Sequence, residues 1–262
     1  MRVLFYPELP DREGYTIVSI CHELGYQGVA TLDEAFDLAF TWQDRAWLDP
    51  QPVLEAIAAR VPVWNLWCRD VGKRRVEAAA RAVMGYGLEV DPTVYAGPCA
   101  MRPVDGGRGF LVHAPVERPE GGYVYQRLVV CTQSGRPAHY RVSVVAGEIP
   151  VCYVLERAPM HEHLRTPVLA CRIVAPDELF SRHEQALLLG VCAHLGLDFG
   201  ELDVLRDDGD GRLHVVDVDK TPGDMGLASR LRWTVAQRRF ALGRLAEAFA
   251  AAVQAGRPHR RA

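Results

Sequence analysis

Residues 1–66 show two hydrophobic patterns that follow one another in turn, one typical of buried strands and one typical of helices. Short, wholly apolar runs are separated by segments in which apolar residues recur every three or four positions, as on one face of a helix. The five segments are 3–6, 14–24, 36–41, 52–60 and 61–66. Strands that alternate with helices predict a parallel sheet with crossover helices, so we expect an α/β domain in this range.

Residues 67–138 combine one helical segment with several short extended ones. The alanine-rich run from Asp70 to Tyr86 predicts a helix, with Asp70 as its N-cap and Gly87 at its end. Strand-like runs separated by glycine and proline follow at 100–102, 110–113 and 123–130. We expect a small antiparallel sheet here.

Residues 139–262 predict a larger sheet accompanied by two helices. Strand patterns occur at 140–145, 150–155, 168–174, 201–205 and 213–218. A helix opens at Pro176, since proline suits the first helical position, and Gly196 ends it. An amphipathic helix over 227–254 closes the chain. We expect it to pack on its own chain, with a homodimer interface as the alternative.

The composition narrows the class of protein. A net charge of -3 argues against a dedicated nucleic-acid binder. No apolar run reaches the roughly 18 residues that a membrane span needs, and no signal-peptide pattern is present. Seven scattered cysteines without a CxxC pair indicate small buried side chains, not a zinc site or disulfides. We therefore expect a cytoplasmic protein without nucleic-acid or membrane partners.

The candidate chemistry lies near the C-terminal end of the predicted sheet. Asp217 and Asp219 follow an apolar strand and project to the same side, because alternate strand residues share a face. Asp203 lies on the partner strand of a hairpin predicted around residues 207–211. If the register pairs these strands, three carboxylates converge, and their repulsion requires protonation or a cation. Oxygen ligands suit Mg²⁺; an ordinary surface strand is the alternative reading.

Other polar groups receive a structural interpretation. Asp207, Asp208 and Asp210 are expected in a solvated turn, since the calcium-loop pattern that they resemble lacks its glutamate at the twelfth position. The run His161-Glu162-His163 lies between prolines without a third ligand and is expected to be a surface loop. The basic residues at the end of the chain are expected to be a solvated tail.

The acidic segment resembles the closing motif of the ATP-grasp superfamily, E/D-x-N-x-x-P, which here reads Asp217-Val218-Asp219-Lys220-Thr221-Pro222. Further stretches resemble motifs of that family in the same order. They are Asn65, Lys73, Gly87, Pro92-Thr93, Ala100-Met101-Arg102-Pro103, Asp105-Gly106-Gly107-Arg108-Gly109, Tyr125-Gln126-Arg127-Leu128-Val129 and Arg141-Val142-Ser143-Val144-Val145. The resemblance covers nearly the whole chain.

The resemblance implies an α/β fold of ATP-grasp type, in which an N-terminal parallel-sheet domain precedes two α+β subdomains that enclose the nucleotide. The expected boundaries are 1–66 for the N-terminal domain, 67–138 for the nucleotide lid and 139–262 for the subdomain with the metal site and the closing helix.

The resemblance also implies ATP and Mg²⁺ as cofactors and assigns roles to particular residues. The expected phosphate-binding residues are Arg102, Gly106, Gly107 and Gly109. The expected adenine-binding residues are Gln126, Arg127, Leu128 and Val129. Asp203, Asp217 and Asp219 would hold Mg²⁺, and Arg141 and Lys220 would be catalytic. Each role has a structural alternative. Arg102 could be a surface cation, the glycines an ordinary turn, Gln126 and Arg127 plain strand residues, and Arg141 part of a structural ion pair.

The activity implied by the resemblance is ATP-dependent ligation of a small-molecule carboxylate to an amine through an acyl-phosphate. Two alternatives remain: a kinase on the same fold, and a degenerate ATP-grasp protein that binds without turnover. The intervals from Thr93 to Arg102 and from the glycine loop to Gln126 are short, whereas the family places a further lysine and a helix there.

Overall fold

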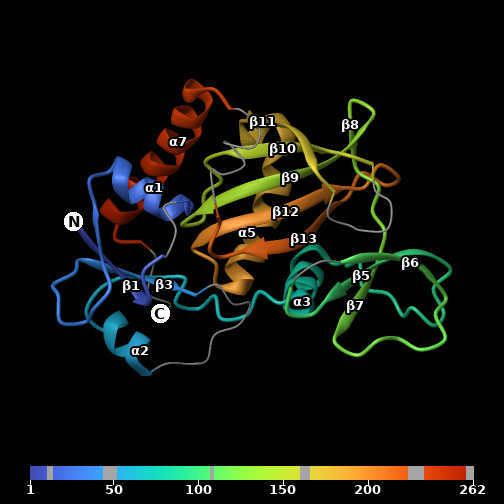
Figure 1. Cartoon of the computed structure of the whole chain (residues 1–262), viewed down its shortest axis with the longest axis horizontal. Coiled ribbons are helices and arrows are strands. Elements are labelled where there is room, and N and C mark those ends of the chain that lie inside the picture. Colours follow the sequence, from blue (N-terminus) through green and yellow to red (C-terminus); the bar gives the residue numbers. More distant parts are fainter. Residues whose placement is uncertain (11–13, 44–51, 107–108, 160–165, 224–232, 258–262) are drawn as a thin grey trace.

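The computed structural model describes residues 1–10, 14–43, 52–106, 109–159, 166–223 and 233–257. Three sheets form the molecule. A parallel N-terminal sheet and a small antiparallel sheet lie at opposite ends, and a large antiparallel sheet lies between them (Figure 1). Within the described residues, no helix has the length and apolar character that crossing a membrane requires.

The N-terminal sheet is parallel throughout, as predicted, with strand order β2-β1-β3-β4. Its elements are β1 (Arg2–Pro7), α1 (Thr16–Glu23), β2 (Gln27–Val29), β3 (Leu38–Trp42), α2 (Pro52–Ala58) and β4 (Val63–Trp64). The short strand β2 was not predicted, because its three residues carry no apolar run.

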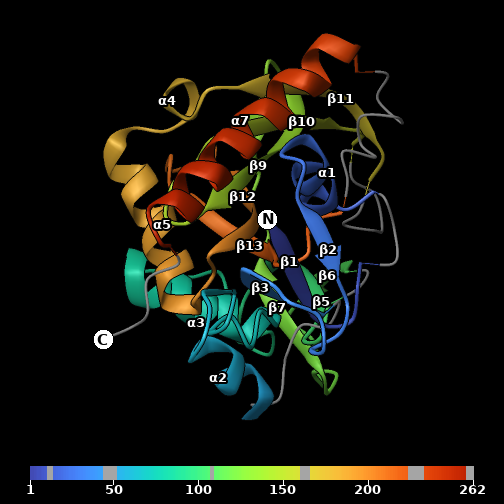
Figure 2. The same cartoon turned by 90° about the vertical axis from the view of Figure 1, so that its left-hand side faces the viewer.

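The closing helix α7 (Val235–Gln254) packs on its own chain, alongside α1 (Figure 2). Phe249 is fully buried, and its ring centroid lies 4.6 Å from that of Trp64 on β4. Thr234 caps α7 by accepting a hydrogen bond from the Gln237 amide, so this helix begins at Val235. The predicted start at residue 227 lies outside the described residues.

The small sheet, with strand order β6-β5-β7, contains β5 (Gly97–Pro103), β6 (Phe110–Ala114) and β7 (Tyr123–Arg127). Helix α3 (Lys73–Met84) precedes it. The N-cap of α3 is Gly72, and the prediction of Asp70 is wrong, because the Asp70 carboxylate accepts the Gly72 amide instead. Val76 and Ala79 of α3 are buried in the core of the large sheet, so α3 packs on that sheet.

The large sheet has the order β11-β10-β9-β12-β13, with β8 added beside β9. Its strands are β8 (Thr132–Gln133), β9 (Arg136–Val145), β10 (Cys152–Arg157), β11 (Val168–Val174), β12 (Phe199–Arg206) and β13 (Leu213–Asp219). The helix predicted after Pro176 is divided into α4 (Pro176–Leu179) and α5 (Arg182–Leu195). The break lies at Phe180, whose backbone is extended, and at Ser181, whose hydroxyl caps α5 by accepting the Glu184 amide.

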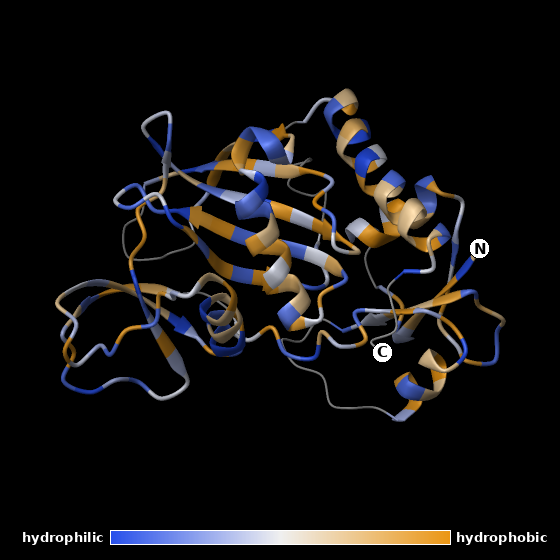
Figure 3. Cartoon of the chain, turned by 180° about the vertical axis from the view of Figure 1, so that it is seen from behind, coloured by the Kyte–Doolittle hydropathy of each residue, from blue (hydrophilic) through white to orange (hydrophobic). Residues whose placement is uncertain are grey.

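The large sheet is apolar where it packs on α3 and α5. Its opposite face combines an apolar part, in the core with α1 and α7, and a polar part on β9, β12 and β13. Side chains such as Val142, Leu202 and Val204 are fully buried in one core with α3 and α5. Their neighbours in sequence, among them Arg141 and Asp203, point to the opposite face. Apolar and polar residues accordingly alternate along these strands (Figure 3).

A β-bulge on β13 brings the acidic residues to the polar side. The pairing shifts by one residue after Asp203, which lies opposite Asp217, whereas Val204 lies opposite Val215. Val215 belongs to the apolar core, and simple alternation would place Asp217 beside it. The extra residue, Val216, reverses the phase, so that Asp217 and Asp219 oppose Asp203 and Glu201.

Candidate functional site

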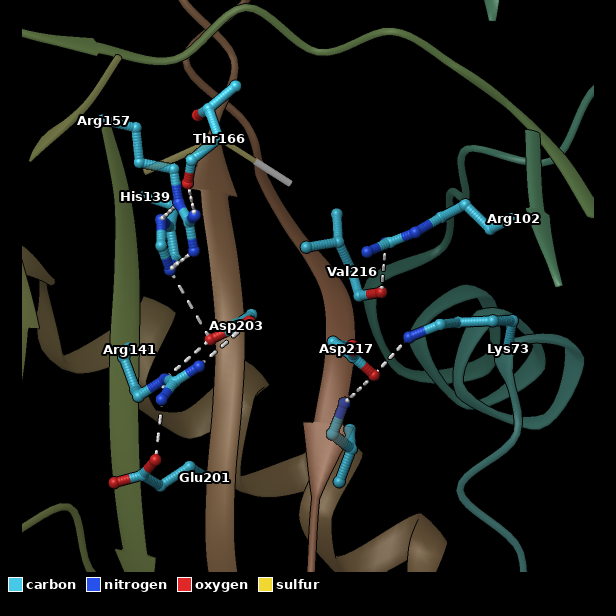
Figure 4. Close-up of polar contacts among 11 residues, drawn as sticks. Lys73, Arg102, His139, Arg141, Arg157, Thr166, Glu201, Asp203, Val216 and Asp217 are labelled. Carbon is cyan, nitrogen blue, oxygen red and sulfur yellow. Dashed lines mark hydrogen bonds and ion pairs between the residues drawn. The ribbon is translucent and has the colours of Figure 1, made fainter. Parts of the chain in front are cut away.

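We call the polar face the set of side chains that β9, β12 and β13 project away from α5 (Figure 4). Two rows of paired residues cross the strands. Arg141, Asp203 and Asp217 form one row, and Ser143, Glu201 and Asp219 form the next. Four carboxylates and one guanidinium therefore gather on adjoining strands, as the predicted hairpin register requires.

Arg141 is held between two acidic residues. Its Nε lies 3.0 Å from Asp203 Oδ1 and 3.5 Å from Glu201 Oε2. Burial alone would lower the pKa of Arg141, but these carboxylates outweigh it and raise that pKa. Burial likewise would raise the pKa of Asp203, and Arg141 with His139 lowers it well below its usual range. Both groups of this pair stay charged.

Glu201 is nearly inaccessible, with 7% of its surface exposed. Burial raises its pKa to about 7, and Arg141 only partly opposes that effect. The Ser143 hydroxyl lies 3.2 Å from Glu201 Oε1 and donates to it.

A buried histidine continues the array along β9. Arg157 Nε donates to His139 Nδ1 over 2.8 Å, and a second Arg157 nitrogen donates to the Thr166 carbonyl over 2.5 Å. His139 Nε2 lies 3.7 Å from Asp203 Oδ1. Burial lowers the pKa of His139 to about 4, so the imidazole is neutral near pH 7.

Two cations reach β13 from the elements beside it. The Lys73 ammonium, from the first turn of α3, contacts Asp217 Oδ1 and is 4% exposed. Burial lowers the pKa of Lys73, and Asp217 opposes that shift. Arg102, at the end of β5, donates to the Val216 carbonyl over 2.7 Å. Lys73 of α3 and Arg102 of the small sheet therefore contact neighbouring residues of β13.

The three predicted metal ligands share a face, but their oxygens do not form one compact group. Arg141 binds Asp203 and Lys73 binds Asp217, whereas Asp219 accepts the Thr221 amide over 2.9 Å. Their donor set is purely carboxylate, which suits a hard divalent cation such as Mg²⁺. Three aspartates against the two cations that contact them leave an excess of negative charge even when Glu201 is protonated, so the residues fit such an ion.

Another acidic group lies at the hairpin turn, where Asp207, Asp210 and His214 place ligand atoms within 4.8 Å of one another. The Arg127 guanidinium lies among them, 2.6 Å from Asp207 and 3.0 Å from His214. The prediction that Asp207 belongs to a solvated turn is wrong, since Asp207 is only 8% exposed. Arg127 supplies the positive charge here, so we assign no metal to this group.

The predicted glycine loop is described in part. Gly106 adopts a φ of 93°, a left-handed conformation that a side chain would strain, and Gly109 is buried. Gly107 lies outside the described residues. Lys220 is buried, and its charge acts on Cys68, which is part of the apolar core.

The predicted adenine-binding segment connects β7 to β8. The Gln126 side chain donates to Glu77 of α3 over 3.0 Å, so it is engaged within the protein. The amides of Arg127 and Leu128 donate to the carbonyls of Leu88 and Pro98. Among the described residues, nothing accepts the Val129 amide, which leaves it as the main-chain donor of this segment.

Several residues of the polar face were absent from the predicted site. Glu201 and His139 each stand two positions before a predicted residue on the same strand, so alternation could have identified them. In the sequence, Lys73 belongs only to a motif resemblance, and Arg157 carries no signal. Both enter the array from other elements, which a local pattern cannot reveal.

No protein-family model and no curated protein matches the sequence. Solved structures do match. The ATP-grasp ligase PsnB complexed with minimal precursor is 13% identical with a TM-score of 0.62, covering 95% of this chain and 98% of that one. D-alanine--D-alanine ligase from Bacillus anthracis is 14% identical with a TM-score of 0.59, covering 97% and 98%.

The macrocyclase MdnC, bound with precursor peptide MdnA from Microcystis aeruginosa MRC, is 10% identical with a TM-score of 0.54. The alignment covers 96% of this chain and 100% of MdnC. Together with the parallel N-terminal sheet and the two antiparallel sheets, these likenesses over whole chains bear out the predicted architecture. This chain has the fold of the ATP-grasp superfamily.

Proposed function

We propose that this protein is an ATP- and Mg²⁺-dependent enzyme that joins a carboxylate to an amine through an acyl-phosphate. The observation that carries the proposal is the contact of Arg141 and Lys73 with carboxylates of β12 and β13, beside Arg102, which donates to a main-chain carbonyl of β13. A nucleoside triphosphate needs cationic groups for its phosphates, and its metal ion needs carboxylates at the same place. The ligases of the same fold support the choice of reaction.

Each group has a physical task in this reaction. Lys73 and Arg102 reach β13 from α3 and β5, where they would neutralise phosphate oxygens. Asp203, Asp217 and Asp219 would hold Mg²⁺, whose charge stabilises the negative charge that develops on the phosphates. Arg141, fixed by Asp203 and Glu201, would bind the transferring phosphoryl group.

The proposed reaction has two balanced steps. A carboxylate oxygen of the substrate attacks the γ-phosphorus, the bond to the bridging oxygen breaks, and ADP leaves. The amine nitrogen then attacks the acyl carbon. The C–O bond to the phosphate breaks, inorganic phosphate leaves with the electron pair of that bond, and the nitrogen loses one proton. ADP and phosphate therefore form in equal amounts. The Arg141 side chain is 20% exposed, so its guanidinium is only partly open to water.

The base would bind along the segment from β7 to β8. Val129 is 7% exposed, and its amide would be the donor there, because the Arg127 and Leu128 amides are already engaged. Adenine offers a ring nitrogen as acceptor beside its amino group, so it can bind a main-chain edge. Gln126 and Arg127 would act through their backbone position, since their side chains contact Glu77 and Asp207.

The substrates are small carboxylates and amines, or a peptide that carries one of these groups. PsnB and MdnC were each captured with a precursor peptide, which supports including peptides. A screen would combine ATP, Mg²⁺ and pooled amino acids or peptides, and would measure ADP and phosphate separately. Hydroxylamine added as the nucleophile would convert an acyl-phosphate to a hydroxamate without the natural amine.

The outcomes distinguish the candidate functions. Equal ADP and phosphate that depend on a carboxylate, together with a hydroxamate, would support the ligase. ADP without phosphate would indicate a kinase. Nucleotide binding without turnover on any pool would indicate a degenerate binding protein. Asp217→Asn serves as the control, since any true turnover should require this carboxylate.

A further inference from the structure

The turn between β12 and β13 lies beside the segment that leads from the small sheet to the large one (Figure 1). Asp207 in this turn is buried, and its Oδ2 lies 2.6 Å from the guanidinium of Arg127, the last residue of β7. A second Arg127 nitrogen lies 3.0 Å from Nε2 of buried His214. The end of the small sheet is therefore tied to the large sheet by an ion pair.

Backbone contacts extend this connection past Arg127. The Asp208 amide donates to the Val130 carbonyl over 2.8 Å, and the Thr132 amide donates to Asp208 Oδ1 over 3.2 Å. The turn is braced in itself, because Asp207 Oδ1 accepts the Gly209 amide over 2.9 Å. Residues 127, 130 and 132 thus all contact one turn, at Asp207 or Asp208.

We propose that Arg127 and Asp207 are positioning residues for the nucleotide base. Their ion pair fixes the chain before Leu128, and the turn that carries Asp207 holds it after Val129 through Asp208. The Val129 amide would then be presented to the base in a fixed direction. This inference rests on the proposed function, in which that amide binds adenine. The proposed phosphate contacts come from Lys73, Arg102 and Arg141 on other elements, so the ion pair should affect only the adenosine half of the ligand.

That division gives a direct test with two ligands. ADP carries adenosine and two phosphates, whereas pyrophosphate carries the phosphates alone. Calorimetric titrations with Mg²⁺ would compare both ligands on the wild type, Asp207→Asn and Asp210→Asn. The asparagine at 207 retains an oxygen for the Gly209 amide but loses the charge that Arg127 needs. Asp210 is the matched control, because it lies on the same turn but its Oδ2 is 4.0 Å from the Arg127 guanidinium, beyond hydrogen-bond distance.

We expect Asp207→Asn to weaken ADP binding about tenfold, which is about 1.4 kcal/mol, and to change pyrophosphate binding less than twofold. Asp210→Asn should change neither. Arg127→Met should weaken ADP similarly, and the double variant should be no weaker than Arg127→Met alone, because both act through one contact. If Asp207→Asn proves unstable, Arg127→Lys replaces it, with the same expected selectivity for ADP.

Three results would overturn the proposal: parallel losses for ADP and pyrophosphate, unchanged ADP binding, or equal effects at 207 and 210. Wild-type protein that binds pyrophosphate but not ADP would also reject it. Wild-type protein that binds neither ligand would reject the proposed function itself, and that outcome is visible before any variant is made.

Discussion

The two faces of the large sheet are built from the same strands but perform different tasks. Leu202 and Asp203 are consecutive residues of β12, yet Leu202 is fully buried under the helices and Asp203 forms an ion pair with Arg141. The apolar face gains its free energy from removing hydrocarbon from water. The polar face instead keeps charges close together, at a cost that the fold must offset. Stability and chemistry are therefore separated by a single step along the chain.

The largest effect on chemistry should come from Asp217→Asn. Turnover should fall about 100-fold or more, because the variant removes a proposed ligand charge from the metal site. Stability should fall less than for an apolar-face truncation, since the asparagine oxygen can still accept from Lys73. Steady-state kinetics and thermal unfolding measure the two effects. Turnover within a few-fold of wild type would remove Asp217 from the account.

The largest effect on stability should come from Leu202→Ala. Removing this fully buried side chain should lower the free energy of unfolding by about 2–5 kcal/mol, through lost burial and the cavity left behind. Mg²⁺-ADP affinity of the folded fraction should stay within about threefold, since the residue points away from the polar face. Urea unfolding and calorimetry test both parts. A large loss of affinity in folded protein would contradict the separation of the faces.

An intermediate effect is expected from Arg141→Lys. Lysine keeps the charge but cannot contact Asp203 and Glu201 with a planar fork, so the phosphoryl contact should be misplaced. We expect turnover to fall about tenfold to 100-fold, with a smaller change in the KM for ATP. Arg136→Lys is the matched control. Arg136 lies at the start of β9 and forms an exposed ion pair with Glu156, so its replacement should leave turnover unchanged.

The smallest effect is a change in how stability depends on pH. The folded pKa of Glu201 is about 7, above the ordinary 4.5, so the folded state binds this proton more tightly than the unfolded state. The contribution of Glu201 to stability therefore falls as pH rises from about 4.5 to about 7. Glu201→Gln should remove that decline. Urea unfolding of metal-free protein across this range, compared with wild type, measures the difference in slope, and identical slopes would contradict the assignment.

The sequence predicted the architecture well where the signals were local. The turn residues 207–211 identified the hairpin that pairs Asp203 with Asp217, and the spacing of two residues placed Asp217 and Asp219 on one side. The bulge at Val216 was not predicted. The consecutive valines 215 and 216 interrupt the alternation, but an interruption alone does not distinguish a bulge from a residue that is apolar on the outer face. Without it, Asp217 would face the apolar core, so its orientation depends on a feature outside the pattern.

Contacts between distant segments were the part that sequence could not supply. Lys73 and Asp217 are 144 positions apart in the sequence. Only the packing of α3 beside β13 brings them together. The burial of Asp207 has the same origin, because Arg127 arrives from another sheet. An acidic, glycine-rich turn is normally solvated, and nothing in its own residues indicates a partner.

The central claim is that the polar face and the elements beside it bind a nucleotide with its metal. Titration calorimetry with ADP, with and without Mg²⁺, on the wild type and Asp217→Asn tests it most directly. The account predicts one ADP bound per chain, with an affinity that falls at least tenfold when Mg²⁺ is removed or Asp217 is changed. ADP binding that is absent, or equally tight in all these conditions, would contradict it.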